Sequence, residues 1–245
     1  MAAPTVLTNA TIWYGGYDLT GATNEITMNA ARAEKPVSRF GDTVEATYPG
    51  AMTVGVEANG FWDSALDGPQ FTQLTAPTTS WPLTVCPDGG DESETAYGLD
   101  GYSFNYSTME AAFGQSVPYR LSIKAKSGTS LARGAVMLPK ATILDTTLGT
   151  KIQVGAVSSS QKLVAHFHLF ALTGVSSWTL YAMSDADSSG GGETIRATQA
   201  SVTSAPSSYT LEASGPITDT WWQARAIKSS GTNLTIAATF AIVDA

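Results

Sequence analysis

The sequence contains one cysteine, Cys86, among its 245 residues. An intrachain disulfide and a metal site built from several cysteines are therefore excluded. Charged side chains are scarce as well, at 14% of the chain, against about 25% in an average soluble domain. Because long exposed helices are built largely from Glu, Lys, Arg and Leu, this scarcity predicts a chain with few of them.

The sequence has fewer basic than acidic residues: it contains 13 Lys and Arg and 21 Asp and Glu, which gives a net charge of −8. Phosphate binding requires Lys and Arg, so this charge disfavours a protein that clamps nucleic acid. Long apolar runs are also missing. The most apolar window, residues 163–172, is about half as long as a membrane-spanning helix. We interpret it as a buried strand and expect no membrane partner.

What the sequence does contain is a succession of β-branched or alternating runs separated by Gly, Pro, Asp and Asn. These runs predict an all-β protein. The expected strands are residues 11–14, 24–32, 52–61, 83–86, 98–106, 119–126, 134–138, 163–172, 178–184, 195–203, 208–212, 221–228 and 234–243. Short helices are expected at residues 63–75 and 107–113.

Two segments indicate how the chain is organised. Residues 33–51 form a long link between two well-patterned strands, longer than a hairpin needs, and such loops are usually functional or ordered by a partner. Residues 146–160 are rich in Gly, Ser and Thr and precede a new set of strands. We therefore predict two domains, residues 1–154 and 155–245.

Motifs for enzymatic chemistry are missing from the sequence. It contains neither a Gly-x-Ser-x-Gly nucleophile elbow nor a glycine-rich phosphate loop between a strand and a helix. We therefore predict no enzyme, no catalytic residues and no cofactor.

Two clusters resemble metal sites. Asp185, Asp187, Ser189 and Gly190 occupy the first, third, fifth and sixth positions of a calcium loop, but the twelfth position is Arg196 instead of Glu. We interpret this segment as a hairpin loop.

The only two histidines, His166 and His168, share one face of a predicted strand and lack a third His or a Cys as ligand. We interpret them as half-buried strand residues, and predict no metal site.

The tandem pair Trp221 and Trp222 lies in a predicted strand, so one indole faces the core and the other faces away. An outward tryptophan stacks on a sugar, fills a subunit contact or packs against loops of its own domain. Both residues are therefore candidates for a surface aromatic contact, and a carbohydrate-binding adhesion module remains an alternative function.

Several motifs in the first 140 residues occur in the order and spacing of a known family. They are Gly16-Tyr-Asp-Leu-Thr-Gly21 followed by Asn24-Glu-Ile-Thr-Met28, then Phe40-Gly-Asp-Thr43, Tyr48-Pro-Gly50 and the passage from Val54 to Asp63. With these motifs the chain resembles the major tail tube proteins of long non-contractile-tailed bacteriophages (siphoviruses), especially those of actinobacterial hosts. Residues after 155 resemble, more loosely, the small β-sandwich that decorates many tail proteins.

The resemblance implies a fold and a function. The expected fold is a tail-tube-like β-barrel or sandwich with a short helix and a long loop, followed by a C-terminal β-sandwich. Six copies would form a ring, rings would stack into the tail tube of the virion, and genomic DNA would pass through it transiently, without binding. The expected partners are other copies of the chain and other tail proteins, and assembly would occur in the host cytoplasm. A minor tail or decoration protein is a further alternative.

Within this framework, the alternation of residues 24–32 and 52–61 separates two faces. One face is apolar and expected in a core, with Ile26, Met28, Ala30, Met52, Val54, Val56 and Ala58. The other is polar and slightly acidic, and we hypothesise that it lines the lumen, with Glu25, Thr27, Asn29, Thr53, Glu57 and Asn59. The link at residues 33–51 is expected to reach the neighbouring ring through Val37, Arg39, Phe40, Asp42, Glu45 and Tyr48.

Overall fold

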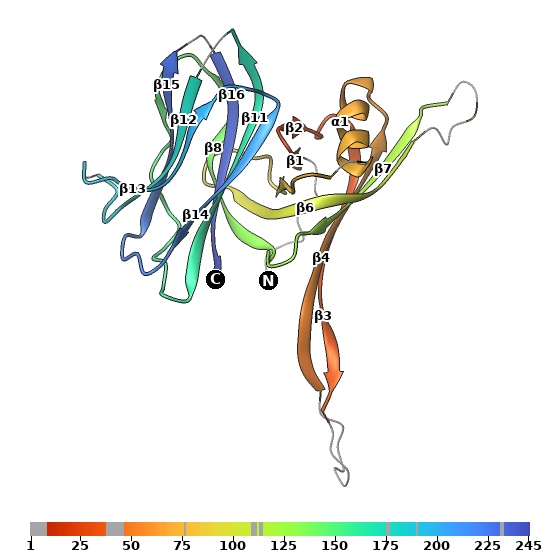
Figure 1. The fold of residues 1–245 in the computed structure, drawn as a ribbon, viewed down its shortest axis with the longest axis horizontal. Coiled ribbons are helices and arrows are strands. Elements are labelled where there is room, and N and C mark those ends of the chain that lie inside the picture. Colours follow the sequence, from red (N-terminus) through yellow and green to blue (C-terminus); the bar gives the residue numbers. More distant parts are fainter. Residues whose placement is uncertain are drawn as a thin grey trace. The chain divides into compact units, whose positions relative to one another are not determined.

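The computed structural model describes residues 9–37, 47–75, 77–108, 112, 115–174, 177–189, 191–230 and 233–245. Strands dominate these residues, and one α-helix occurs among them, which confirms the all-β prediction (Figure 1). The chain forms two compact units. Unit 1 comprises Met1–Gly21, Trp81–Asp100 and Ala132–Ala245, and unit 2 comprises Ala22–Ser80 and Gly101–Leu131.

Unit 1 contains a β-sandwich made of two antiparallel sheets. The first sheet has the order β14 (Ser207–Ser214), β11 (Gln161–Thr173), β16 (Asn233–Asp244) and β8 (Ala132–Ile143). The second has the order β10 (Ile152–Gln153), β15 (Trp221–Ser230), β12 (Ser177–Asp185) and β13 (Thr194–Val202), and β9 (Thr147–Leu148) also pairs with β15. The last strand of the chain, β16, is therefore an inner strand of the first sheet.

The core of the sandwich lies between these sheets because alternate residues of each strand point inward. Phe167 on β11 packs edge-on against Phe240 on β16, with ring centroids 6.0 Å apart. The second sheet contributes Trp178 and Trp222, both fully buried. The indole N–H of Trp222 donates a hydrogen bond of 2.8 Å to the carbonyl oxygen of Gly155, so its one polar atom is satisfied inside the core.

The remaining strands of unit 1 form a second, smaller core. They are β1 (Thr11–Tyr14), β2 (Tyr17–Asp18), β5 (Trp81–Cys86) and the first half of β6 (Thr95–Thr108). Trp13 is the largest side chain of this core and packs with Cys86 and Ala96. Gly15 and Gly16, both at positive φ, form the two-residue turn between β1 and β2, which is the backbone that a tight hairpin requires.

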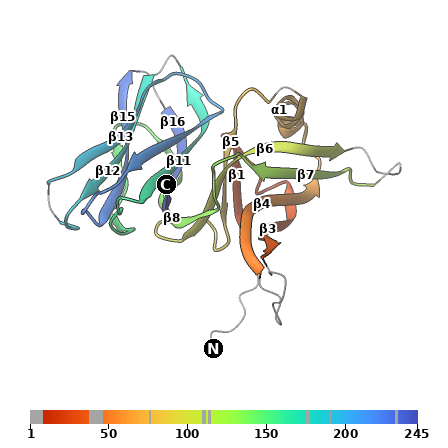
Figure 2. The same cartoon turned by 60° about the horizontal axis from the view of Figure 1, so that its bottom comes forward.

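Unit 2 is a four-stranded antiparallel sheet with a helix. The sheet has the order β3 (Thr23–Pro36), β4 (Thr47–Phe61), β7 (Pro118–Ala125) and the second half of β6. The helix α1 spans Ser64–Thr75, as the sequence predicts. The carboxylate of Asp63 caps it by accepting a bond from the backbone N–H of Ala65. It lies beside β6 (Figure 2). There the hydroxyl of Tyr106 donates a hydrogen bond to the carboxylate of Asp67.

Two sequence expectations need correction, and a third is narrowed. In its described residues, 33–37 and 47–51, the link is mostly strand, because β3 continues to Pro36 and β4 already begins at Thr47. The helix expected at residues 107–113 is wrong at its start, since Ser107 and Thr108 pair with β7; most of its other residues lie outside the described ones. The described sheets end in open strands and do not close a barrel.

The division into units also differs from a single cut near residue 154. That position lies inside unit 1, where β8, before it, pairs with β16, after it, from Gly134 to Ile143. The sandwich thus recruits strands from both sides of the expected boundary. Within the described residues, no helix has the length and the apolar character that crossing a membrane requires.

Replacing Trp222 by alanine should lower the free energy of unfolding by about 3–5 kcal/mol, since the substitution leaves a large cavity and an unpaired carbonyl at Gly155. Trp221→Ala is the matched control, because this neighbour is only half-buried; it should cost about 1 kcal/mol or less. Equilibrium urea denaturation followed by circular dichroism measures both. Equal losses for the two variants would contradict the assignment of Trp222 to the core.

Candidate assembly surface

Unit 2 presents one continuous polar surface, which we call the polar face. Cross-strand register aligns its side chains in rows over β3, β4 and β7 because opposite residues of an antiparallel pair point to the same side. The rows are Glu25–Asn59–Arg120, Thr27–Glu57–Ser122 and Asn29–Gly55–Lys124, with Ala31 and Thr53 beyond them. The six residues expected on a polar face are thus brought together.

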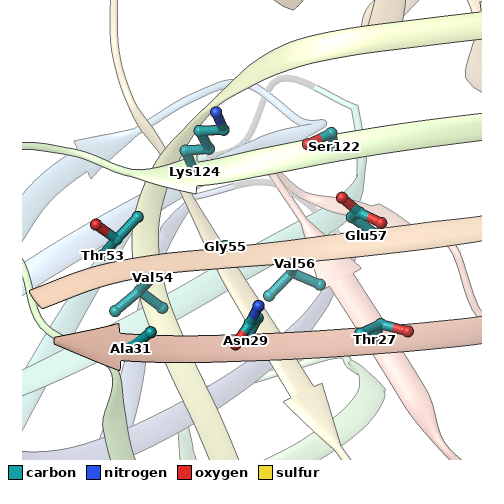
Figure 3. A pocket seen from close by; sticks show the side chains of 10 residues that line it. All are labelled: Thr27, Asn29, Ala31, Thr53, Val54, Gly55, Val56, Glu57, Ser122 and Lys124. Atoms are coloured by element: carbon teal, nitrogen blue, oxygen red, sulfur yellow. The ribbon is translucent and has the colours of Figure 1, made fainter. Parts of the chain in front are cut away.

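A hollow of about 230 Å³ opens at the centre of the polar face. Gly55 lies in the middle of the central strand and has no side chain to fill the space between Asn29 and Lys124. Figure 3 shows Thr53, Glu57 and Lys124 around this space. Hydroxyl, amide, carboxylate and ammonium groups therefore border the hollow, and Ala31, Val54 and Val56 add apolar atoms to its lining.

The third strand changes the charge that the sequence predicts for this face. Glu25 and Glu57 are its two acids, but β7 adds Arg120 and Lys124, so the four charges sum to zero. The slight acidity expected for the face on β3 and β4 is thus balanced by two bases of β7, a strand that the expectation did not include. The alternation of basic or polar residues with apolar ones in the predicted strand 119–126 is the sequence signal that identifies these residues.

The four charged groups form no ion pairs in the described part of the chain. The amide of Asn59 instead donates a hydrogen bond of 3.1 Å to the carboxylate of Glu25. The ammonium of Lys124 lies 5.4 Å from the ring centroid of Phe104. All four remain available to other molecules in solution.

The opposite side of the same strands is apolar, as the alternation predicts. Val54, Val56 and Ala58 of β4 are buried there. Ile26 and Met28 of β3 are half-buried, and Met52 is too, whereas Ala30 is exposed. Burial thus decreases along the sheet toward the far ends of β3 and β4.

Those far ends form a two-stranded ribbon, which we call the arm. β7 pairs with β4 only from Gly55 to Phe61, while β3 and β4 stay paired as far as Pro36 and Thr47. Every residue of β3 from Asn29 onward is exposed. The six residues after Ala30 extend the arm by about 20 Å, and Figure 1 shows it projecting from the rest of unit 2.

Only two of the residues expected to contact a neighbouring ring can be placed. Tyr48 on the arm is 67% exposed and Val37 is 48% exposed. Arg39, Phe40, Asp42 and Glu45 lie outside the described residues.

The sheet of unit 2 also has two open edges. Within the described residues, β3 pairs with β4 alone, and the second half of β6 pairs with β7 alone. Each edge presents backbone N–H and C=O groups that can pair with a strand of another molecule.

The two histidines are packing residues of unit 1. His168 is fully buried and its Nε2 lies 2.9 Å from the hydroxyl of Thr84. His166 is 3% exposed, and its Nε2 lies 3.8 Å from the carboxylate of Asp100. Burial lowers the pKa of both rings, well below the usual range for His168. Both residues are more deeply buried than the sequence indicates.

The loop with calcium-like spacing is a hairpin loop between β12 and β13, as the sequence favours. The ammonium of Lys151 occupies its centre, 2.5 Å from the carboxylate of Asp185 and 3.0 Å from that of Glu193. The hydrogen bonds to Lys151 lower the pKa of both carboxyl groups. Among the described residues, no cluster of three His, Cys, Asp or Glu side chains has the arrangement of a metal site.

The tandem tryptophans face opposite sides of β15. Trp222 is fully buried, whereas Trp221 is half-buried and opposite Gln153 on the neighbouring strand. Of the two, only Trp221 has an exposed surface with which to contact another molecule.

No protein-family model matches the sequence, and no curated protein has significant similarity to it. Solved structures show a distant likeness. A chain of the virion of a native gene transfer agent particle aligns with 52% of this chain and 98% of its own length, at 10% identity and a TM-score of 0.43. A chain of the sheath–tube complex of an extracellular contractile injection system, PVC, in its extended state aligns with 54% of this chain and 93% of its own, at 11% identity and a TM-score of 0.41.

A third likeness extends over nearly the whole chain. The Dit protein of SPP1, described as a paradigm of the hub adsorption apparatus in phages that infect Gram-positive hosts, aligns with 96% of this chain and 99% of its own, at 11% identity and a TM-score of 0.34. At these identities and scores the likeness concerns the fold alone.

Acidification should destabilise unit 1 through its two histidines. Both rings are neutral in the folded chain because their pKa values lie below the ordinary value of 6.5. The unfolded chain binds more protons below that pH, so stability present above pH 6.5 is lost as the pH falls. At pH 5 the loss should reach up to about 2 kcal/mol for each histidine.

Urea denaturation at pH 7, 6 and 5 measures this loss. The control is the double variant His166→Asn with His168→Asn, which should be less stable at pH 7 but should decline less steeply toward pH 5. An equally steep decline in the variant would show that other groups cause the acid sensitivity.

Proposed function

We propose that this protein is a structural subunit of a phage-type tail, six copies of which form a ring, and that stacked rings form the tail tube through which DNA passes. The arm is the observation that carries this proposal. An isolated two-stranded ribbon is marginally stable in water, yet β3 and β4 continue about 20 Å beyond their last neighbouring strand. Such a ribbon gains a stable environment when another subunit packs against it.

The open edges of unit 2 support ring formation. Strands alternate in direction along the order β3, β4, β7, β6, so β3 of one copy can continue the antiparallel pattern beside β6 of the next. This contact joins two different edges and is therefore heterologous, the type that closes a ring when the rotation between copies allows it.

The arm supplies the second contact that stacking needs. It carries Tyr48, 67% exposed, and is followed by Val37, 48% exposed, and tyrosine is one of the residues that are enriched in contact surfaces between proteins. In the resemblance to tail tube proteins, this region reaches the neighbouring ring. We place the contact between rings on the arm and on residues 37–48.

The polar face is our proposal for the lumen. Its residues present hydroxyl, amide and charged groups, with Ala31 as the one apolar side chain in its rows. A hydrated wall with equal numbers of positive and negative charges has little net attraction for DNA, as a conduit requires. The apolar side of the same strands then faces away from the channel.

Shortening the arm should abolish tube formation and leave the fold intact. The variant replaces residues 33–51 with Asn-Gly, which joins Arg32 to Met52, an opposed pair, through a two-residue hairpin turn. The described residues that are removed, 33–37 and 47–51, bury little surface, so the free energy of unfolding should stay within about 0.5 kcal/mol of the parent. Negative-stain electron microscopy of concentrated protein detects tubes and rings.

A matched pair of point variants tests the same contact. Tyr48→Ser should reduce tube yield severalfold, whereas Leu144→Ser, which removes a similarly exposed side chain (61% against 67%) from unit 1, should not. Normal tubes from the arm-shortened variant would exclude the arm from assembly. A low copy number of the protein in purified virions would favour a minor tail or hub protein instead.

Charge reversal tests the lumen assignment. Glu25→Lys combined with Glu57→Lys changes the polar face from zero to four positive charges per subunit, which should attract DNA phosphates and slow ejection severalfold. Dye release from virions measures the rate, and tubes should still assemble. The control, Arg120→Glu with Lys124→Glu, gives four negative charges and should not slow ejection. Equal rates for the two variants would place the polar face elsewhere.

A further inference from the structure

We propose, on the basis of the proposed function, that Arg120, Lys124 and the hollow at Gly55 form a weak contact site for the phosphate backbone of double-stranded DNA. The chain as a whole is acidic, and its charge gives no indication of such a site. The site arises only because β7 adds a basic column to the polar face.

The basic column has the geometry for two phosphate contacts. Arg120 and Lys124 are exposed and lie four residues apart on one side of β7, which places them about 13 Å apart. Neither cation is engaged by an ion pair among the described residues. A duplex that passes along the face therefore meets, in each subunit, two cations that have no ion-pair partner among the described residues.

The hollow supplies neutral donors beside Lys124. Asn29, Thr53 and Ser122 line it together with the lysine (Figure 3), and amide and hydroxyl groups donate to phosphate oxygens in protein–DNA contacts. A Cβ on Gly55 would lie 3.4 Å from its nearest atom, the carbonyl oxygen of Ile123. A side chain therefore fits at this position, and it would fill the hollow.

The acids of the same face keep the contact weak. Glu25 and Glu57 lie one or two strands away from the basic column, within about 10 Å of it. At this distance each carboxylate lowers the affinity for a phosphate about twofold in water. The wall therefore holds DNA briefly, and ions at physiological concentration compete with it.

Fluorescence anisotropy with a short labelled DNA duplex tests the site on the full-length protein, dilute enough to remain unassembled. Two phosphate contacts should make the affinity fall about tenfold between 50 and 200 mM salt. Glu25→Gln with Glu57→Gln should bind about fourfold more tightly than the parent. Arg120→Gln with Lys124→Gln should abolish binding, while Arg133→Gln, an exposed arginine of unit 1, should have no effect.

Gly55→Val tests the hollow without a change of charge. It should weaken binding severalfold while the salt dependence stays the same, because the cations remain and the neutral donors are covered. Binding that is lost with Arg133→Gln, or that survives Arg120→Gln with Lys124→Gln, would overturn the site. Absence of binding by the Glu25→Gln, Glu57→Gln variant at 50 mM salt would overturn it as well.

Electron microscopy of the same variants separates this inference from the proposed function. If one of the outcomes above overturns the site while the variants still form tubes, the tail-tube assignment stays intact and only the phosphate site is removed. DNA binding by a protein that forms neither rings nor tubes would support the site and contradict the tube.

Discussion

The backbone pairing of β4 is the interaction on which the candidate surface depends. β4 is bonded to β3 along nearly its whole length but to β7 only from Gly55 to Phe61. Where both neighbours are present, three strands align the rows of the polar face and place Gly55 at the centre. Where β7 ends, the same two strands continue as the arm. Because β4 pairs with β3 over a longer stretch than with β7, the same strand forms part of both the polar face and the arm.

The two units differ in how their charged groups are used. In unit 1, Lys151 forms ion pairs with both Asp185 and Glu193, and the guanidinium of Arg196 donates a hydrogen bond of 2.9 Å to the carboxylate of Asp219. These pairs are partly buried and link neighbouring segments of unit 1. The charges of the polar face in unit 2 form no such pairs among the described residues. Unpaired charge, open edges and an exposed ribbon occur together in unit 2, which is why the proposed contacts lie there.

Strands could be predicted from the sequence because alternation and β-branched runs are local signals; β1 and α1 are examples with accurate bounds. The pairing partner of each strand could not be predicted, because pairing depends on contacts between residues that are distant in the sequence. The alternation of Arg120 and Lys124 was visible, but their place beside Gly55 follows only from the register of β7 with β4. The sequence predicts a loop where the arm lies, because a ribbon that is exposed on both faces, as residues 32–36 are, has no apolar alternation.

The position of β16 between β11 and β8 determines when the protein can fold during synthesis. The first sheet of the sandwich lacks an inner strand until Asn233–Asp244, the end of the described chain, has left the ribosome. Unit 2 is complete once residue 131 has emerged. Its sheet, with both edges open, therefore exists for the time taken to make more than a hundred further residues. Exposed charges on β3, such as those of Arg32 and Lys35, disfavour the pairing of this edge with other chains during that time.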